Sequence, residues 1–537
     1  MKLERLPEYV TVTLVTLIGI LVAVYCGKAA GSGQMGLVGV VCGGAIGITI
    51  ALAMGKRIWL LIVWLCLLDG RLMPIPAPLN VDQLMVMGSL VLFIGFRALK
   101  LIKEKPQYGM LDLWMLINLL WIASEFFRHP TGVLWLNSDR IAGRPYAEIL
   151  IALCAYWVLI RVTMEPEDAR RIPVVALGFS ALQTTWTAIS YFIPSSAPVL
   201  AKFYSAVASG GDSADVMDSS EGGEAGEQSR LVFFSIFGGH LTRVLMSYFP
   251  PLTLINPLYI FRFFCFIVGV IGILLGGFRS GLAGFIGTFL ICSYLKQGWR
   301  AVLIHIAVVL PILSVVVMLQ GRAYELPYTA QRALSFLPGK WDANALEAAK
   351  GSTEWRVEMW RTVLSDRKYI QNKLLGDGFG YSQNELITLL IQQANGTLGD
   401  MREIFMVQGS VHSGPVSAIK FGGYIGLGLF YCLQFALAHA AWKLIRRSSG
   451  TPYSPIAYFF GLPMIWLPIN YTFIFGAYEK DLPLAIFSVG MIRAIDSGLK
   501  KYKARLAEES EDAESFAPKH NERKALLGTA MRLGNAS

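Results

Sequence analysis

The sequence is poor in charge. Of its 537 residues, 16% are Asp, Glu, Lys or Arg and 54% are hydrophobic. A soluble globular domain contains about a quarter of charged residues, so this composition excludes an ordinary soluble domain. The mean hydropathy is +0.51. The net charge of +10 is no sign of a nucleic-acid partner, because the Lys and Arg residues of a membrane protein collect in its cytoplasmic loops. No nucleic-acid partner is expected.

The long polar segment 320–411 contains no cysteine, and the sequence lacks the common metal-binding motifs. All seven cysteines fall within apolar runs, and none lies in the long polar segment 320–411. This placement indicates neither a disulfide framework nor a cysteine metal site. The sequence has no HExxH motif, no Walker loop and no pair of carboxylates at catalytic spacing. We therefore expect no metal ion, no cofactor and no ATP hydrolysis.

Long apolar runs are present along most of the chain. About 20 apolar residues cross a bilayer as a helix, and about fourteen runs approach this length. The expected fold is an all-α polytopic integral membrane protein with about 12–14 transmembrane helices and one large extracytoplasmic helical loop. The first run is expected to be a retained helix rather than a signal peptide. The runs are 9–26, 34–54, 58–68, 83–99, 110–126, 147–160, 172–193, 236–255, 258–276, 282–295, 301–319, 415–441, 455–475 and 482–495.

Positive charge predicts the topology. Basic clusters occupy alternate loops, and the positive-inside rule places these loops in the cytoplasm. The alternation requires 236–255 to be a span, although His240, Arg243 and two prolines interrupt it. Both termini are then cytoplasmic, and the segment 320–411 faces outward. The clusters are Lys56-Arg57, Arg97 to Lys105, Arg161 to Arg171, Lys296 to Arg300, Lys443 to Arg447, and Lys500 to Arg505.

The expected organisation has four parts. They are transmembrane helices over 1–319, a large outward loop over 320–412, further transmembrane helices over 413–497, and a cytoplasmic polar tail over 498–537. Within the first part, 205–230 is rich in Gly, Ser and acidic residues. The acids recur every three residues, and such a regular spacing suggests calcium ligands, but the glycine and glutamate arrangement of a calcium loop is missing. A disordered outward linker is the better interpretation.

Arg279 is the first candidate site residue. It stands between two apolar runs, at the outer edge of the expected membrane. It is either an anchor at a helix end or a clamp for an anion, because its planar guanidinium matches phosphate oxygens. Spacing alone leaves both interpretations open.

His412 is the second candidate. It stands where the long polar segment returns to an apolar run, whereas the other histidines lie within apolar runs or in other loops. A neutral imidazole at this position accepts a proton from a hydroxyl group. A polar cap at the membrane interface explains it equally well.

The outward segment is expected to contain a helix over 342–366. Arg356, Trp360 and Val363 share one face of this helix by the i, i+3 and i+4 spacing. The helix either lies on the membrane surface or places Arg356 beside Arg279 around a diphosphate. Further on, the glycine-rich segment 376–380 allows positive φ and close approach of the backbone. A plain turn is the simpler explanation for that segment.

Four of these features, in this order, resemble the O-antigen ligase family of membrane glycosyltransferases, which includes O-antigen polymerase-like proteins. The resemblance covers about 258–430, and two positions depart from the family pattern. Ser413 follows the histidine where the family commonly has Asn, and Lys420 stands where the family is usually apolar or acidic. The four features are Arg279-Ser280-Gly281 between two runs, Arg356 to Trp360 in the outward helix, the glycine-rich stop 375–380, and His412 followed by Gly423-Tyr424-Ile425-Gly426-Leu427.

The resemblance implies a donor, an acceptor and a location. The donor is a glycan on a polyprenyl diphosphate in the bacterial inner membrane, with the active site facing the periplasm. The acceptor is a hydroxyl of the lipid A core in a ligase, or of another lipid-linked glycan in an O-antigen or exopolysaccharide polymerase. The catalytic residues implied are His412, Arg279 and Arg356. The substrate-binding residues implied are Arg279, Ser280, Arg332, Arg356, Trp360, Gly376 and Gly378.

A polysaccharide flippase or another transporter is the rival from a different class. Transporters are commonly built from internal repeats with broken helices near the midplane. The sequence shows no convincing repeat, and its single large outward loop favours a reaction at the membrane surface.

Overall fold

The chain, seen here as a computed structural model, is described at residues 8–32, 53–68, 70–72, 79–100, 102, 104–106, 108–132, 140–205, 231–395 and 402–516, and at positions 41, 44 and 49. The expected span 34–54 falls mostly outside the described residues. The expected linker beyond residue 205 and the last part of the expected tail also fall outside them.

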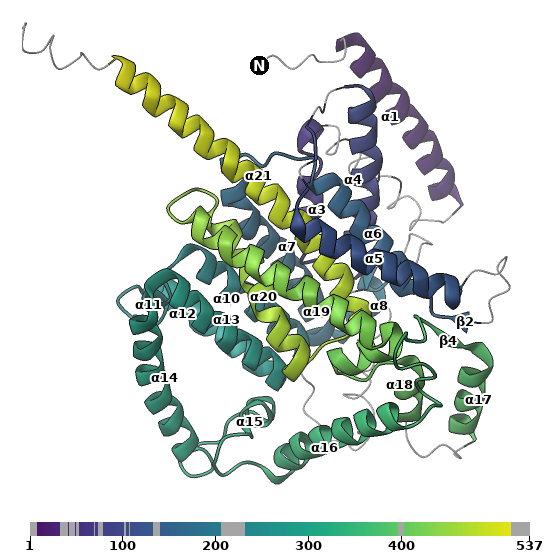
Figure 1. Ribbon diagram of the computed structural model, residues 1–537, viewed down its shortest axis with the longest axis vertical. Coiled ribbons are helices and arrows are strands. Elements are labelled where there is room, and N and C mark those ends of the chain that lie inside the picture. The colour runs from purple at the N-terminus through teal and green to yellow at the C-terminus, as the bar shows by residue number, and fades with distance from the viewer. Residues whose placement is uncertain are drawn as a thin grey trace, which may run out of the picture.

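Helices dominate the described residues (Figure 1). Up to residue 205 they are α1 (Glu8–Gly31), η1 (Gly55–Arg57), α3 (Leu60–Trp64), α4 (Val81–Ala98), α5 (Met110–Arg128), α6 (Arg144–Leu159), α7 (Pro166–Phe192), η3 (Pro194–Ser196) and α8 (Ala197–Leu200). From residue 231 they are α10 (Val232–Tyr248), α11 (Pro251–Leu254), α12 (Ile260–Leu275), α13 (Arg279–Gln297), α14 (Trp299–Leu319), α15 (Tyr328–Leu334), α16 (Ala343–Ser365), α17 (Gln383–Ala394), α18 (Arg402–Gln408), α19 (Gly414–Ser448), α20 (Ser454–Ile469), the π-helix η4 (Asn470–Ile474) and α21 (Tyr478–Phe516).

The expected helical membrane protein is confirmed. Among the described residues, seven helices are long and apolar enough to cross a membrane: α4, α5, α7, α14, α19, α20 with its continuation η4, and α21. The shorter apolar helix α12 coincides with another expected span. The total of 12–14 spans stays a prediction.

Three helix boundaries differ from those expected. α10 ends at Tyr248 instead of residue 255, because Phe249 precedes Pro250 and a residue before proline avoids the helical region. α19 continues to Ser448 and α21 to Phe516, so α21 extends well into the expected polar tail.

Two pairs of short strands join segments that the charge pattern places on the outer side. β1 (Arg71–Leu72) pairs antiparallel with β3 (Tyr204–Ser205). β2 (Arg140–Ile141) pairs in the same way with β4 (Tyr381–Ser382) of the long polar segment. The packing therefore agrees with the predicted topology on this side.

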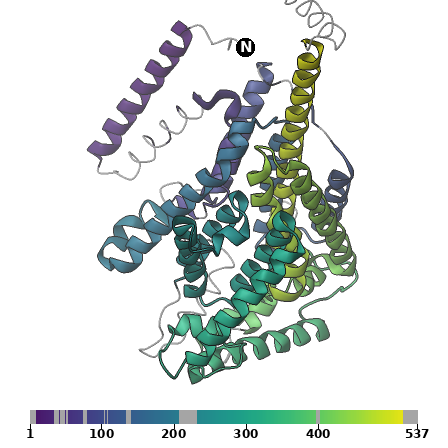
Figure 2. The ribbon, with the colours of Figure 1, turned by 90° about the vertical axis from the view of Figure 1, so that its left-hand side faces the viewer.

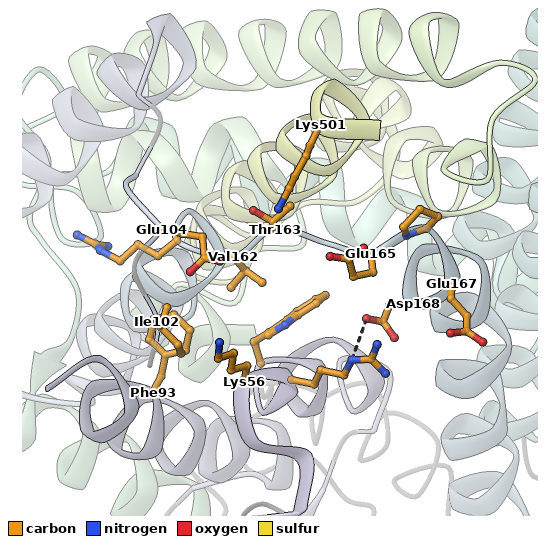
Figure 3. Close-up of a pocket in the computed structure, with 14 residues that line it drawn as sticks. Lys56, Phe93, Ile102, Glu104, Val162, Thr163, Glu165, Glu167, Asp168 and Lys501 are labelled. Atoms are coloured by element: carbon orange, nitrogen blue, oxygen red, sulfur yellow. Dashed lines mark ion pairs between the residues drawn. The ribbon is translucent and has the colours of Figure 1, made fainter. Parts of the chain in front are cut away.

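The basic clusters come together at the other end of the bundle. There a pocket of about 540 Å³ is lined by Lys56, Arg161 and Lys501, which come from three distant parts of the chain (Figure 3). Arg57 forms an ion pair with Asp168 across 3.7 Å at its edge. Four acidic residues, Glu104, Glu165, Glu167 and Asp168, also line this pocket. The positive-inside rule predicts that this end is cytoplasmic.

The bundle core lies between α6, α19, α20 and α21. Leu433 and Leu437 of α19 are fully buried there with Ile486 and Val489 of α21. Close helix pairs include α6 with α21, α19 with α20, and α10 with α12. This core holds the first turn of α19 in place, directly after His412.

The described residues of the outward segment contain four helices, α15 to α18, and the expected helix over 342–366 is confirmed as α16. Asp342 caps it, since its carboxylate accepts hydrogen bonds from the amides of Asn344 at 2.9 Å and Ala345 at 3.1 Å. In Figures 1 and 2, α16 runs across one end of the bundle, opposite the end where α21 leaves it. Its buried residues Met359 and Val363 pack in one cluster with the start of α19.

Candidate active site

One stripe of α16 links the predicted site residues. Ala349, Thr353, Arg356 and Trp360 follow one another at helical spacings of four, three and four residues, which put them on one side of the helix. One end of this stripe contacts Arg279, the first residue of α13, and the other end contacts Val411, shortly before α19 begins. We call these four residues the α16 stripe.

Arg279 meets one end of the α16 stripe. It is the first residue of α13, and its Nη2 donates hydrogen bonds to the carbonyl oxygen of Ala349 at 2.9 Å and to Oγ1 of Thr353 at 3.1 Å. The side chain therefore points toward the outward helix and is only partly buried. This contact was not evident from the sequence, because it joins residues 70 and 74 positions apart.

His412 lies at the other end of the stripe. Nε1 of Trp360 donates a hydrogen bond to the carbonyl oxygen of Val411 at 2.7 Å, directly before His412. The His412 ring lies between Trp355 and Phe475, with ring centroids at 5.9 Å and 5.5 Å. Aromatic rings on two sides fix the orientation of the imidazole.

Arg356 stands between these two contacts. It is one turn beyond Thr353 and one turn before Trp360, and these two residues are separated by about 10 Å along the helix axis. Arg356 is partly buried. Arg356 therefore lies on α16 between the contact with Arg279 and the contact with Val411. Its place beside Arg279 around a diphosphate stays a prediction.

His412 also has an unusual backbone. Its φ of 52° lies in the left-handed region, which residues other than glycine rarely adopt. Such a conformation costs about 1–3 kcal/mol and tends to occur where function requires it. The immediately following helix, α19, and the hydrogen bond to Val411 hold the residue in this conformation.

Ser280 follows Arg279 in the chain, and Arg332 lies on a helix that packs against α13. Ser280 belongs to the first turn of α13, and Phe278 at the N-cap has no side-chain acceptor to offer the amides of that turn. A helix N-terminus attracts anions through these amides and the helix dipole. Arg332 lies on α15, which packs against α12, α13 and α16. Sequence analysis gave Arg279 and Ser280 as candidates for phosphate binding, but not the amides of this helix start.

Gly376 and Gly378 lie elsewhere, against α19. Both have left-handed φ, 81° and 71°. A Cβ on Gly376 would lie 2.5 Å from the carbonyl oxygen of Phe421 and from the amide nitrogen of Gly423, so this glycine is required by the close approach of two backbones. The amide of Gly378 donates to the carbonyl oxygen of Phe421 at 2.9 Å. These contacts support the plain-turn interpretation.

Residues of the outward loop after α5 hold the same glycine segment. Arg140 donates to the carbonyl oxygens of Asp377 at 2.6 Å and Gly380 at 2.7 Å, and Thr131 donates to that of Phe379 at 2.7 Å. Burial, together with the nearby Arg140 guanidinium, lowers the pKa of His129 in this loop. The basic residues of this loop therefore contribute to packing of the glycine segment.

Lys420 is a buried anchor. It is 5% exposed, and its Nζ donates to the carbonyl oxygens of Met406 at 2.6 Å and Val407 at 2.9 Å, at the end of α18. A cation suits the negative end of a helix dipole. This explains the lysine that departs from the family pattern.

α14 presents apolar surface on all sides beyond its first turns. Only Ala301, Val302 and His305 are buried, all near its start. Exposed residues then occur around its whole circumference: Ile306, Val308, Val309, Leu310, Ile312, Val315 and Met318. Within a membrane such a helix contacts lipid, or a lipid-like ligand, on every side.

Comparison of the sequence with protein-family models and with curated proteins gave no match.

Proposed function

We propose that the chain is a membrane glycosyltransferase that moves a glycan from a polyprenyl diphosphate to an acceptor hydroxyl at the outer face of the bacterial inner membrane, as an O-antigen ligase does. The observation that supports this most is the α16 stripe. It aligns two guanidinium groups and one imidazole within about three helical turns, next to the start of a transmembrane helix.

The chemistry divides between the two ends of the stripe. The acceptor oxygen attacks the anomeric carbon, and the bond from that carbon to the diphosphate oxygen breaks. The diphosphate leaves with the bonding electrons, and Arg279 and Arg356 stabilise its added negative charge. The acceptor hydroxyl gives its proton to the imidazole of His412. Ser280 and the first amides of α13 hold a phosphate oxygen.

The remaining predicted residues have supporting roles. Trp360 positions His412 through its hydrogen bond to Val411, and Arg332 adds positive charge from α15. Gly376 and Gly378 shape the loop against α19 and do not touch the donor. The polyprenyl chain lies along the exposed apolar surface of α14, since a lipid must stay in the membrane while its head group reacts.

A polymerase that uses the same donor is the second candidate, because both reactions need the same leaving group. The test is product analysis with purified protein and a short polyprenyl-diphosphate glycan, with a lipid A core acceptor present or absent. Transfer to the core establishes a ligase. A longer glycan on polyprenyl diphosphate, formed without the core, establishes a polymerase. No covalent change in either case refutes the proposed transferase and favours transport, to be measured as flux across liposomes.

A further inference from the structure

Arg243 is an arginine within the bundle that the transfer reaction does not use. It lies on α10, eleven residues after Val232 and five before Tyr248. In the part of the chain that the structure describes, its guanidinium has no hydrogen-bond or ion-pair partner. The nearest aromatic contact is the ring of Phe459, whose centroid lies 5.8 Å from Cζ.

An arginine in such a position requires an explanation. A charged side chain inside a membrane is costly, and those that occur usually face a cavity and mark a site of function. A single face-on contact with an aromatic ring offsets only part of this cost, about 0.5–2 kcal/mol. The guanidinium thus has donors to offer to a ligand.

Arg243 faces a cavity of about 420 Å³ that extends along α6. Residues lining it run along this helix from Arg144, through Glu148 and Ile151, to Ala155. Eleven residues of helix correspond to about 16 Å. The cavity therefore reaches from the outward end of α6 to a level close to its inner end, and we call it the α6 cavity.

Polarity changes along the α6 cavity. Arg144 and Glu148 form an ion pair at 2.7 Å near the outward end, where Asp82 and Lys480 also line it. Between this rim and Arg243 most of the lining is apolar: Ile62, Leu67, Val86, Ile151, Phe460, Pro463, Met464, Leu484 and Phe487. Gln83 and Ser488 also line the cavity, but Oε1 of Gln83 accepts a hydrogen bond from the amide of Asn80, and Oγ of Ser488 donates to the carbonyl oxygen of Leu484. A small hydrated anion therefore finds few polar groups to replace its water along these walls, whereas a hydrocarbon chain matches them.

We propose that the α6 cavity binds an anionic amphipath, in which a carboxylate or phosphate on a hydrocarbon chain pairs with Arg243. The chain lies against the apolar walls. The planar guanidinium suits both anionic groups, because each offers two oxygens for paired hydrogen bonds. Arg243 also lines a second cavity of about 420 Å³ between α10 and α13, where Asp481 offsets its charge. In the α6 cavity the two carboxylates, Asp82 and Glu148, are matched in number by Lys480 and Arg144, so the charge of Arg243 remains and this cavity is the better place for an anion.

The test uses the purified full-length chain in detergent and native mass spectrometry with three probes. Dodecanoate has the charge and the chain, 1-dodecanol has the chain alone, and acetate has the charge alone. We expect dodecanoate to bind at least ten times more tightly than either other probe. Equal binding of dodecanol would mean that the charge has no role, and displacement of dodecanoate by equimolar acetate would mean a simple anion site. Either result overturns the proposal.

Variants locate the site. Arg243→Gln should weaken dodecanoate binding at least tenfold, and Arg243→Lys should retain more of it. Arg262→Gln is the matched control, because Arg262 on the neighbouring α12 already stacks on Phe249 at 4.1 Å. Ala152→Leu adds apolar volume to the cavity wall and should weaken binding without any change of charge. Unchanged binding in both the Arg243→Gln and Ala152→Leu variants refutes the site, whether or not the chain proves to be a transferase.

Discussion

Replacement of His412 by Asn separates the chemical role of this residue from its structural role. Asn is one of the few residues that tolerate the left-handed backbone, so the φ of 52° adds no new cost. The change removes the ring that lies between Trp355 and Phe475. Each ring contact contributes about 0.5–1.5 kcal/mol, so the loss of stability is about 1–3 kcal/mol.

The expected loss of turnover is larger than this loss of stability suggests. A general base accelerates a reaction about 10²–10⁴-fold, equivalent to about 3–5 kcal/mol of activation free energy. We expect His412→Asn to insert and fold, to melt at a slightly lower temperature in detergent, and to transfer glycan at least a hundredfold more slowly. The assay is single-turnover transfer from the polyprenyl-diphosphate donor, with thermal unfolding measured on the same sample.

His439→Asn is the matched control. His439 is exposed on α19, near the opposite end of the helix, and should change neither turnover nor stability. A second variant, His412→Gly, relieves the left-handed strain and should be as inactive as the Asn variant. If either His412 variant retains turnover within about threefold of the wild type, the imidazole is not the proton acceptor and the assignment of the site is wrong.

Three further predictions concern the surroundings of the α16 stripe. Arg279→Ala should reduce steady-state transfer at least a hundredfold, because it removes a charge that stabilises the leaving diphosphate. Thr353→Val removes one hydrogen bond between Arg279 and α16 but no charge, and its transfer should stay near that of the wild type. Equal losses in the two variants would make Arg279 only an anchor. Gly376→Ala should lower the thermal midpoint, because an alanine in the left-handed region costs at least about 1–2 kcal/mol of stability. Gly351→Ala, in open space on α16, should be neutral or stabilising. A normal midpoint for Gly376→Ala contradicts the packing described. Lys420→Met should cost about 1–3 kcal/mol of stability, because it leaves two buried carbonyl groups without a donor. Turnover per folded molecule should stay within a few fold of the wild type. Abolished turnover in the folded variant would mean that Lys420 takes part in the reaction.

Part of this architecture follows directly from the sequence. Apolar runs mark the positions of the described transmembrane helices because a bilayer demands about 20 apolar residues. Asp342 marks the start of α16 because an acidic side chain at this position caps a helix. Alternate basic clusters predict which loops share a side, and the strand pair β2–β4 agrees with that prediction.

Other features depend on contacts between distant segments. The hydrogen bonds from Arg279 to α16 depend on how a loop of nearly a hundred residues folds back, and no local pattern encodes this. A lysine in an apolar run, such as Lys420, gives no sign of the helix end that it contacts. Arg243 appeared in the sequence only as an interruption of a weak span, because its cavity is formed by six helices from the two halves of the chain.

The break in α19 explains how the loop and the membrane helix are held in register. Gly423 has a φ of 68°, so the helical hydrogen bonds are interrupted there. The amide of Tyr424 instead donates to the carbonyl oxygen of Lys373 at 2.8 Å, and Nε1 of Trp121 donates to the carbonyl oxygen of Gly422 at 2.9 Å. The outward segment is therefore hydrogen-bonded to α19 at the level where α19 also contacts α5, rather than laid loosely on the membrane.

Two attachments of the outward segment constrain the site. Trp360 ties α16 to the residue before His412, while the glycine segment ties the loop to α19 about two to three turns after it. Movement of α16 away from Arg279 would have to break both attachments or bend α19 at Gly423, the one position of that helix whose backbone is non-helical. A donor that separates Arg279 from α16 on binding should therefore act on His412 through this bend.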